Sequence, residues 1–78
     1  MNIFDRVQMI FRDILANDEL IIEESLKIGD IEGWDSFAQI NILAACEAEF
    51  KIKFFLEEIA GLKSVNAIVE SIREKVQS

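Results

Sequence analysis

The sequence predicts an all-α fold, a small four-helix bundle with a long first loop and a short third helix. Two segments, about residues 3–16 and 65–76, repeat apolar residues at intervals of three and four, the spacing that places them on one face of a helix. Residues 36–50 follow the same spacing, and no stretch alternates over enough positions to pair as a strand. Helices packed on helices are therefore the predicted layers.

The first helix is expected over about residues 3–16. Asn2 precedes it as a plausible N-cap, and Asn17 is suited to close its other end. The apolar stripe consists of Ile3, Val7, Ile10 and Ile14.

Residues 18–35 follow no sustained period, and Gly29 and Gly33 interrupt them. An eighteen-residue loop is unusually long for so small a domain, and such loops are commonly functional. Five apolar side chains are expected to pin this loop to the core, namely Leu20, Ile22, Leu26, Ile28 and Trp34.

The remaining elements follow the 36–50 helix. Residues 51–54 alternate basic and apolar side chains over too few positions to make a sheet. A short third helix is expected within residues 56–62, ending near Gly61, and Ser64 is suited to cap the final helix.

Length and composition exclude several classes of function. A chain of 78 residues is one small domain over 1–78, too small for most catalytic clefts. Its net charge of −7 repels nucleic acid, and the absence of histidine removes the commonest general base and metal ligand. We therefore expect neither an enzyme nor a nucleic-acid-binding protein.

Cysteine usage and the N-terminal residues bear on the compartment. Cys46 is the one cysteine, so no disulfide scaffold is implied, and its place among alanines predicts a buried, inert thiol. Residues 1–15 carry charges within their apolar pattern and resemble neither a signal peptide nor a membrane span. The expectation is a cytoplasmic monomer without a membrane partner.

The negative charge is concentrated in the loop. Residues 18–35 hold seven acidic residues against Lys27 alone, which is −6 of the net −7. Acidic runs are usually solvated surface. The alternative is an electrostatic recognition site for basic partners.

Ser36 is the residue best placed for covalent chemistry. With Gln39 three residues later it matches the capping box, so its spacing favours a helix N-cap. If Asp35 is the cap instead, the Ser36 hydroxyl stands exposed in the first turn, where a phosphate ester is favoured by the helix N-terminus. A hydrolase using Ser36 ranks last, because no histidine is present to serve as its base.

The segment from Gly33 to Phe54 resembles the acyl carrier protein family. That family has Asp-Ser-Leu at the start of its second helix, which ends in Glu-Glu-Phe. The corresponding residues here are Asp35, Ser36 and Phe37, followed by 47–50, which read Glu-Ala-Glu-Phe. The similarity in length, acidity and helix order extends over essentially the whole chain.

The resemblance implies a carrier that catalyses nothing itself. Ser36 would receive 4'-phosphopantetheine from coenzyme A through a magnesium-dependent phosphopantetheinyl transferase, and Asp35 would help present it. The arm would deliver acyl or aminoacyl groups as thioesters between loading and transferring enzymes of a fatty-acid, polyketide or other specialised pathway. The docking surface implied comprises Phe37, Ile40, Glu47 and Glu49, with the first two also contributing to the core.

The chain departs from the family at the start of this helix. Phe37 replaces the usual leucine, and Ala38, Gln39 and Asn41 stand where typical fatty-acid carriers present an acidic face. This neutral face points away from standard fatty-acid synthesis. The rival hypothesis is an unmodified helical interaction module in which Ser36 is only an N-cap.

Overall fold

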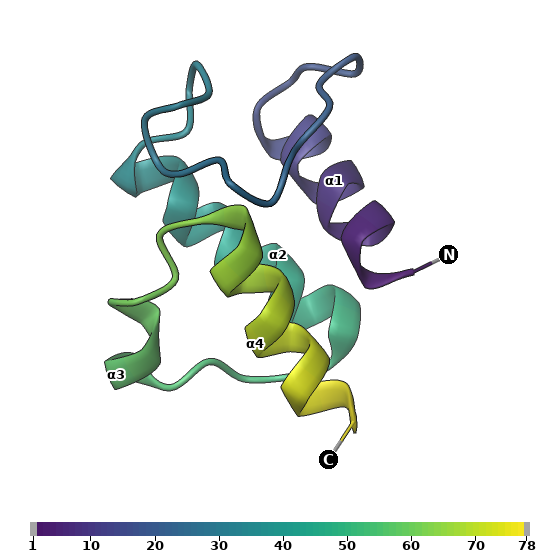
Figure 1. Ribbon diagram of the computed structural model, residues 1–78, viewed down its shortest axis with the longest axis vertical. Coiled ribbons are helices and arrows are strands. Elements are labelled where there is room, and N and C mark those ends of the chain that lie inside the picture. The colour runs from purple at the N-terminus through teal and green to yellow at the C-terminus, as the bar shows by residue number, and fades with distance from the viewer. Residues whose placement is uncertain (1, 78) are drawn as a thin grey trace.

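The computed structural model describes residues 2–77, which contain four helices and no extended sheet. The helices are α1 (Ile3–Ile14), α2 (Ser36–Phe50), α3 (Leu56–Ile59) and α4 (Val65–Gln77). Figure 1 shows α1, α2 and α4 forming the body of the molecule, with α3 at one side and the long loop across one end. The predicted all-α, four-helix fold is confirmed.

The core lies where α1 packs against both α2 and α4. Each of these helices contributes fully buried side chains, and burying one such large apolar group stabilises the fold by about 1.5–3 kcal/mol. The innermost residues of the three helices are Val7, Phe11, Ile42, Cys46, Val65, Ile68 and Ile72.

The first helix has the expected start and an earlier end. The Asn2 side chain accepts a hydrogen bond from the Asp5 backbone N–H at 2.8 Å, which confirms the N-cap. Ala16 is left-handed, with φ of 53°, and the Asn17 N–H closes the helix by donating to the Arg12 carbonyl at 2.9 Å. The Asn17 side chain also accepts from the Glu19 N–H at 3.2 Å, which stabilises the next turn.

The loop over 18–35 is held to the core as predicted. Ile22 and Trp34 are buried, while Leu20, Leu26 and Ile28 pack partly buried against the core. Trp34 meets Phe11 edge to face, with ring centroids 4.9 Å apart. Gly29 and Gly33 have φ of 98° and 90°, a region that glycine enters without a steric penalty.

The loop also pairs briefly with the approach to α4. An isolated antiparallel bridge joins Lys27 and Ser64, and the Val65 N–H donates to the Leu26 carbonyl at 2.9 Å. The Ser64 hydroxyl accepts from the Ala67 N–H at 3.1 Å, which confirms its capping role. The loop is thus attached to α4 as well as to α1.

The short third helix is confirmed, although it ends at Ile59 and so before Gly61. It buries none of its residues. None of the helices within residues 2–77 has the length and apolar character needed to span a bilayer.

Candidate functional site

The start of α2 is organised by Asp35. Its Oδ1 accepts a hydrogen bond from the Ala38 backbone N–H at 2.9 Å, and its carbonyl accepts from the Gln39 N–H at 2.9 Å. Asp35 is therefore the N-cap, and the capping-box interpretation of Ser36 is wrong. The physical reason is that an aspartate one residue earlier satisfies the same orphan donors and leaves Ser36 as the first residue of the helix.

Ser36 is exposed, and its hydroxyl makes no hydrogen bond with any other part of residues 2–77. It stands at the helix end that carries positive partial charge, where an anionic substituent is stabilised. The adjacent Asp35 carboxylate accepts the capping hydrogen bond through its Oδ1. The site is therefore an accessible hydroxyl at the N-terminus of a helix, which another enzyme can reach.

A buried polar bridge lies behind the serine. Gln39 is 7% exposed, and its Oε1 accepts from the indole Nε1 of Trp34 at 2.7 Å. Its Nε2 donates to the Leu62 carbonyl. Gln39 thereby ties the loop, α2 and the α3–α4 connection together.

Sequence reasoning placed Gln39 in a capping box and on an exposed face, and both placements are wrong. The side chain turns inward because Trp34 Nε1 and the Leu62 carbonyl are buried and need hydrogen-bonding partners. Leu62 is 23 residues away, so no local pattern reveals the bridge. The usable signal is a tryptophan expected in the core, whose N–H has to be satisfied.

The exposed side of α2 next to Ser36 is apolar. Phe37 and Ile40 are 77% and 67% exposed, so the expectation that they also belong to the core is wrong. Of the positions predicted to form a neutral face, Asn41 is exposed, whereas Ala38 and Gln39 are buried. The face is neutral because no charged residue occurs in α2 before Glu47.

Glu47 and Glu49 lie at the other end of α2, which is about 20 Å long at 1.5 Å per residue. Glu47 is half-buried, and its Oε2 accepts from the Phe54 N–H at 2.8 Å. Glu49 pairs with Arg6 at 2.6 Å and thereby ties α1 to α2. The structure thus separates these two carboxylates from Ser36 and engages both in internal contacts.

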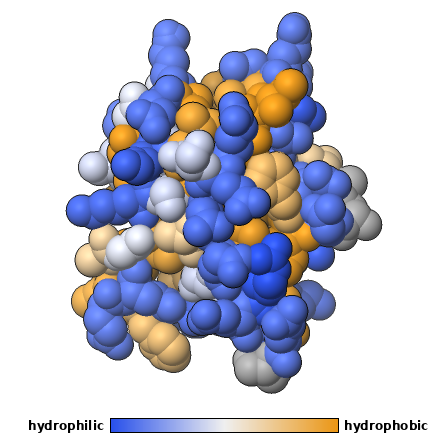
Figure 2. All heavy atoms as spheres, in the orientation of Figure 1, coloured by the Kyte–Doolittle hydropathy of each residue, from blue (hydrophilic) through white to orange (hydrophobic). Residues whose placement is uncertain are grey.

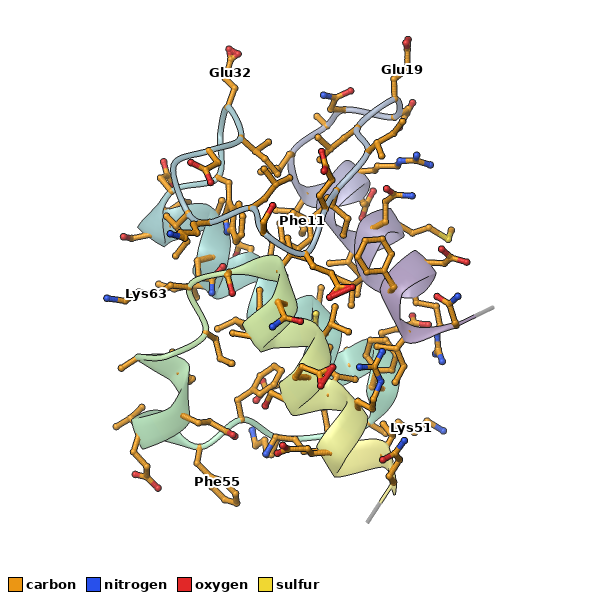
Figure 3. All side chains as sticks on the ribbon, viewed as in Figure 1. Phe11, Glu19, Glu32, Lys51, Phe55 and Lys63 are labelled. Carbon is orange, nitrogen blue, oxygen red and sulfur yellow. The ribbon has the colours of Figure 1, made fainter. Side chains whose placement is uncertain are left out.

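The seven acidic side chains of residues 18–35 are all exposed. Figure 3 shows Glu19 and Glu32 projecting from the loop at one end of the molecule. Across the same view hydrophilic groups cover most of the surface, with apolar groups visible between them (Figure 2). The loop ends at Asp35, the residue before Ser36, so the acidic segment adjoins the serine in the sequence.

A reactive cysteine and a metal centre are the two other kinds of site to consider. Cys46 is fully buried, and that burial raises the pKa of its thiol to about 12, so the predicted inert core cysteine is confirmed. Within residues 2–77 no group of three or more potential metal-ligating side chains is assembled.

Known proteins with similar sequences are acyl carrier proteins. Those of three Clostridium perfringens strains, SM101, ATCC 13124 and 13, are each 33% identical over 75 residues, which covers 95% of this chain and 97% of theirs. No family model matches the chain.

A solved structure agrees with these relatives. The solution NMR structure of holo acyl carrier protein from Geobacter metallireducens superposes with a TM-score of 0.89 at 30% sequence identity. The superposition covers 99% of this chain and 88% of that one.

Proposed function

Because this chain belongs to the acyl carrier protein family, we propose that it carries acyl or aminoacyl groups on a 4'-phosphopantetheine arm attached to Ser36. The observation that supports this site is the exposed Ser36 hydroxyl, released from capping by Asp35. When attached, the group supplies a terminal thiol that holds an acyl group as a thioester.

Attachment requires the chain to present one hydroxyl to a transferase. The Ser36 oxygen forms a phosphodiester with the phosphopantetheine half of coenzyme A, the pyrophosphate bond breaks, and adenosine 3',5'-bisphosphate leaves. The hydroxyl proton passes to a base of the transferase. Magnesium belongs to the transferase in this scheme.

The residues around Ser36 have separate tasks. Asp35 holds the first turn so that the hydroxyl faces outward, and the helix N-terminus stabilises the phosphodiester charge by about 0.3–1 kcal/mol. Phe37 and Ile40 form an apolar contact surface for the transferase and for the loading and transferring enzymes. Tethering then makes each acyl transfer effectively intramolecular.

The pathway we propose is a specialised one. The first three turns of α2 present Phe37, Ile40 and Asn41 without any acid, so enzymes that bind carriers through basic patches find no complement there. Partners of this chain are instead expected to use apolar contacts beside Ser36, with the acidic loop adding attraction at longer range.

The test is direct loading. The purified protein is incubated with coenzyme A, magnesium and a broad-specificity phosphopantetheinyl transferase, and its intact mass is compared with that of Ser36→Ala. A gain of one phosphopantetheine by the unaltered protein alone is expected. A folded protein that gains nothing with several transferases would favour the unmodified interaction module.

A further inference from the structure

We propose a second docking surface, formed by Lys51, Lys53 and Phe55, that binds an acidic peptide segment of a partner protein. We call these three residues the basic edge. It does not involve Ser36 and therefore goes beyond the proposed function.

In residues 51–55, between α2 and α3, exposed side chains alternate with buried or half-buried ones, and the exposed ones form the basic edge. Lys51, Lys53 and Phe55 are exposed, whereas Ile52 is half-buried and Phe54 is 7% exposed. Lys53 and Phe55 are two apart in extended backbone and therefore share a side, about 6–7 Å apart. Lys51 is the left-handed C-cap of α2, with φ of 57°, and it lines one shallow groove together with them. The apolar pair anchors the segment in the body of the protein and presents the other three side chains outward.

The negative charge of the molecule is concentrated at one end. Residues 18–35 carry −6 of the net −7, whereas residues 51–60 are balanced, with Lys51 and Lys53 against Glu57 and Glu58. In Figure 3, Lys51 and Phe55 lie at the end opposite Glu19 and Glu32. An acidic partner is repelled by the loop and accepted at the basic edge.

The two lysines of the basic edge are available to a partner. Neither Lys51 nor Lys53 forms an ion pair with any residue of 2–77. The nearby carboxylate of Glu58 is engaged by Lys75 at 2.7 Å.

Phe55 supplies an apolar anchor that is already ordered. Its ring is 63% exposed, and the Lys75 ammonium lies 4.8 Å from the ring centroid. Its backbone N–H donates to Glu58 Oε1 at 2.6 Å. An exposed aromatic side chain held in place binds a partner at a smaller entropic cost than a mobile one. A shallow groove runs between Phe55 and the lysines, lined also by Ile52 and Lys75.

A peptide fits this groove better than a membrane surface. The Lys53 backbone N–H donates no hydrogen bond within residues 2–77, so an extended peptide can pair with it while its carboxylates meet the lysines. The length of α2, about 20 Å, separates the basic edge from Ser36. A partner bound here leaves the serine free for another enzyme.

The probe is a capped peptide of about eight residues that alternates glutamate and leucine, titrated into ¹⁵N-labelled protein at low salt. We expect saturable changes in the backbone amide chemical shifts of residues 51–56 and of the end of α4. Lys51→Glu with Lys53→Glu should raise the Kd at least about tenfold. The matched control, Lys27→Glu with Lys63→Glu, makes the same change in net charge at exposed sites elsewhere and should stay within about twofold.

Several results would overturn the proposal. They are shifts elsewhere on the protein, no saturation, or equal weakening by both double variants, which would mean a response to net charge alone. Binding to phosphatidylglycerol vesicles without binding to the peptide would assign the basic edge to a membrane instead. Ser36→Ala should bind the peptide normally, so a failure of phosphopantetheine loading and a failure of this surface remain distinguishable.

Discussion

The indole N–H of Trp34 donates a hydrogen bond to the Gln39 side chain across 2.7 Å, inside the core and directly behind the exposed Ser36. Gln39 also donates to the Leu62 carbonyl. The same residue therefore holds the end of the loop and the start of α2 at fixed positions relative to the α3–α4 connection. Gln39 is one turn after Ser36 in α2, so this bridge fixes the turn in which the serine lies.

Replacing Gln39 with leucine should destabilise the fold by about 2 kcal/mol or more, because it leaves the Trp34 N–H and the Leu62 carbonyl buried without partners. Urea unfolding followed by the fluorescence of Trp34 measures this. Asn41→Leu is the matched control on the exposed side of the same helix and should change stability by less than about 0.5 kcal/mol. Equal effects of the two variants would argue against the bridge.

Ser36→Ala should leave the free energy of unfolding nearly unchanged, within about 0.5 kcal/mol, because Ser36 is not the cap. Asp35→Ala should cost about 1 kcal/mol through loss of the hydrogen bond to the Ala38 N–H. Thermal or urea unfolding compares the two variants. If Ser36→Ala were the more damaging substitution, the assignment of the cap to Asp35 would be refuted.

Phe37→Ala should reduce kcat/KM for phosphopantetheine transfer about tenfold while leaving stability unchanged, since the ring is 77% exposed and belongs to the contact surface proposed for the transferase. Loading rates at several protein concentrations give this ratio. Met9→Ala, at a 53% exposed position on α1, is the control and should load at the normal rate. A normal rate for Phe37→Ala would remove this side chain from the docking surface.

The contribution of Glu58 to the stability of the fold should be lost in acid. Its hydrogen bonds from Lys75 and from the Phe55 backbone hold the pKa of this carboxyl below its ordinary value of 4.5. A lowered pKa in the folded state means that the contribution is complete above about pH 4.5 and is lost as the pH falls through the folded pKa.

This direction of the pH dependence is tested by measuring the free energy of unfolding of Glu58→Gln and of the unaltered protein in urea, from pH 7 to pH 3. The difference between the variant and the unaltered protein should be largest at neutral pH and should shrink below about pH 4.5. Glu57→Gln, one residue earlier in the same helix, is the control. A difference that grew in acid would contradict the assignment.

Local pattern was sufficient for the helices. The interval of three and four in 3–14 and 65–77 indicates both a helix and its buried face. The apolar run over 36–50 indicates a helix but not its buried face, because Phe37 and Ile40 are exposed. Where the prediction of a helix was wrong, the error concerned only its last residues. The first helix ends at Ile14, two residues before the predicted end, while Asn17 closes it as predicted through its N–H to the Arg12 carbonyl.

The site was determined only in part by the sequence. Aspartate, serine and an apolar residue at 35–37, taken together with chain length, acidity and helix order, indicate the family and the candidate attachment site. They do not decide whether Asp35 or Ser36 caps α2, since both residue types are good caps. The hydrogen bond from the Ala38 N–H to Asp35 settles that choice and frees the hydroxyl.

Tertiary structure alone decided the roles of Gln39 and of residues 51–55. Gln39 points inward because it has two buried partners, of which the Leu62 carbonyl is 23 residues away and beyond the reach of local propensity. Lys53 and Phe55 face the solvent because Ile52 and Phe54 pack against the body of the protein, and Lys51 lines the same groove from the left-handed C-cap of α2. The sequence by itself determined the helices and the candidate serine, whereas long-range packing determined which side chains around them face the solvent.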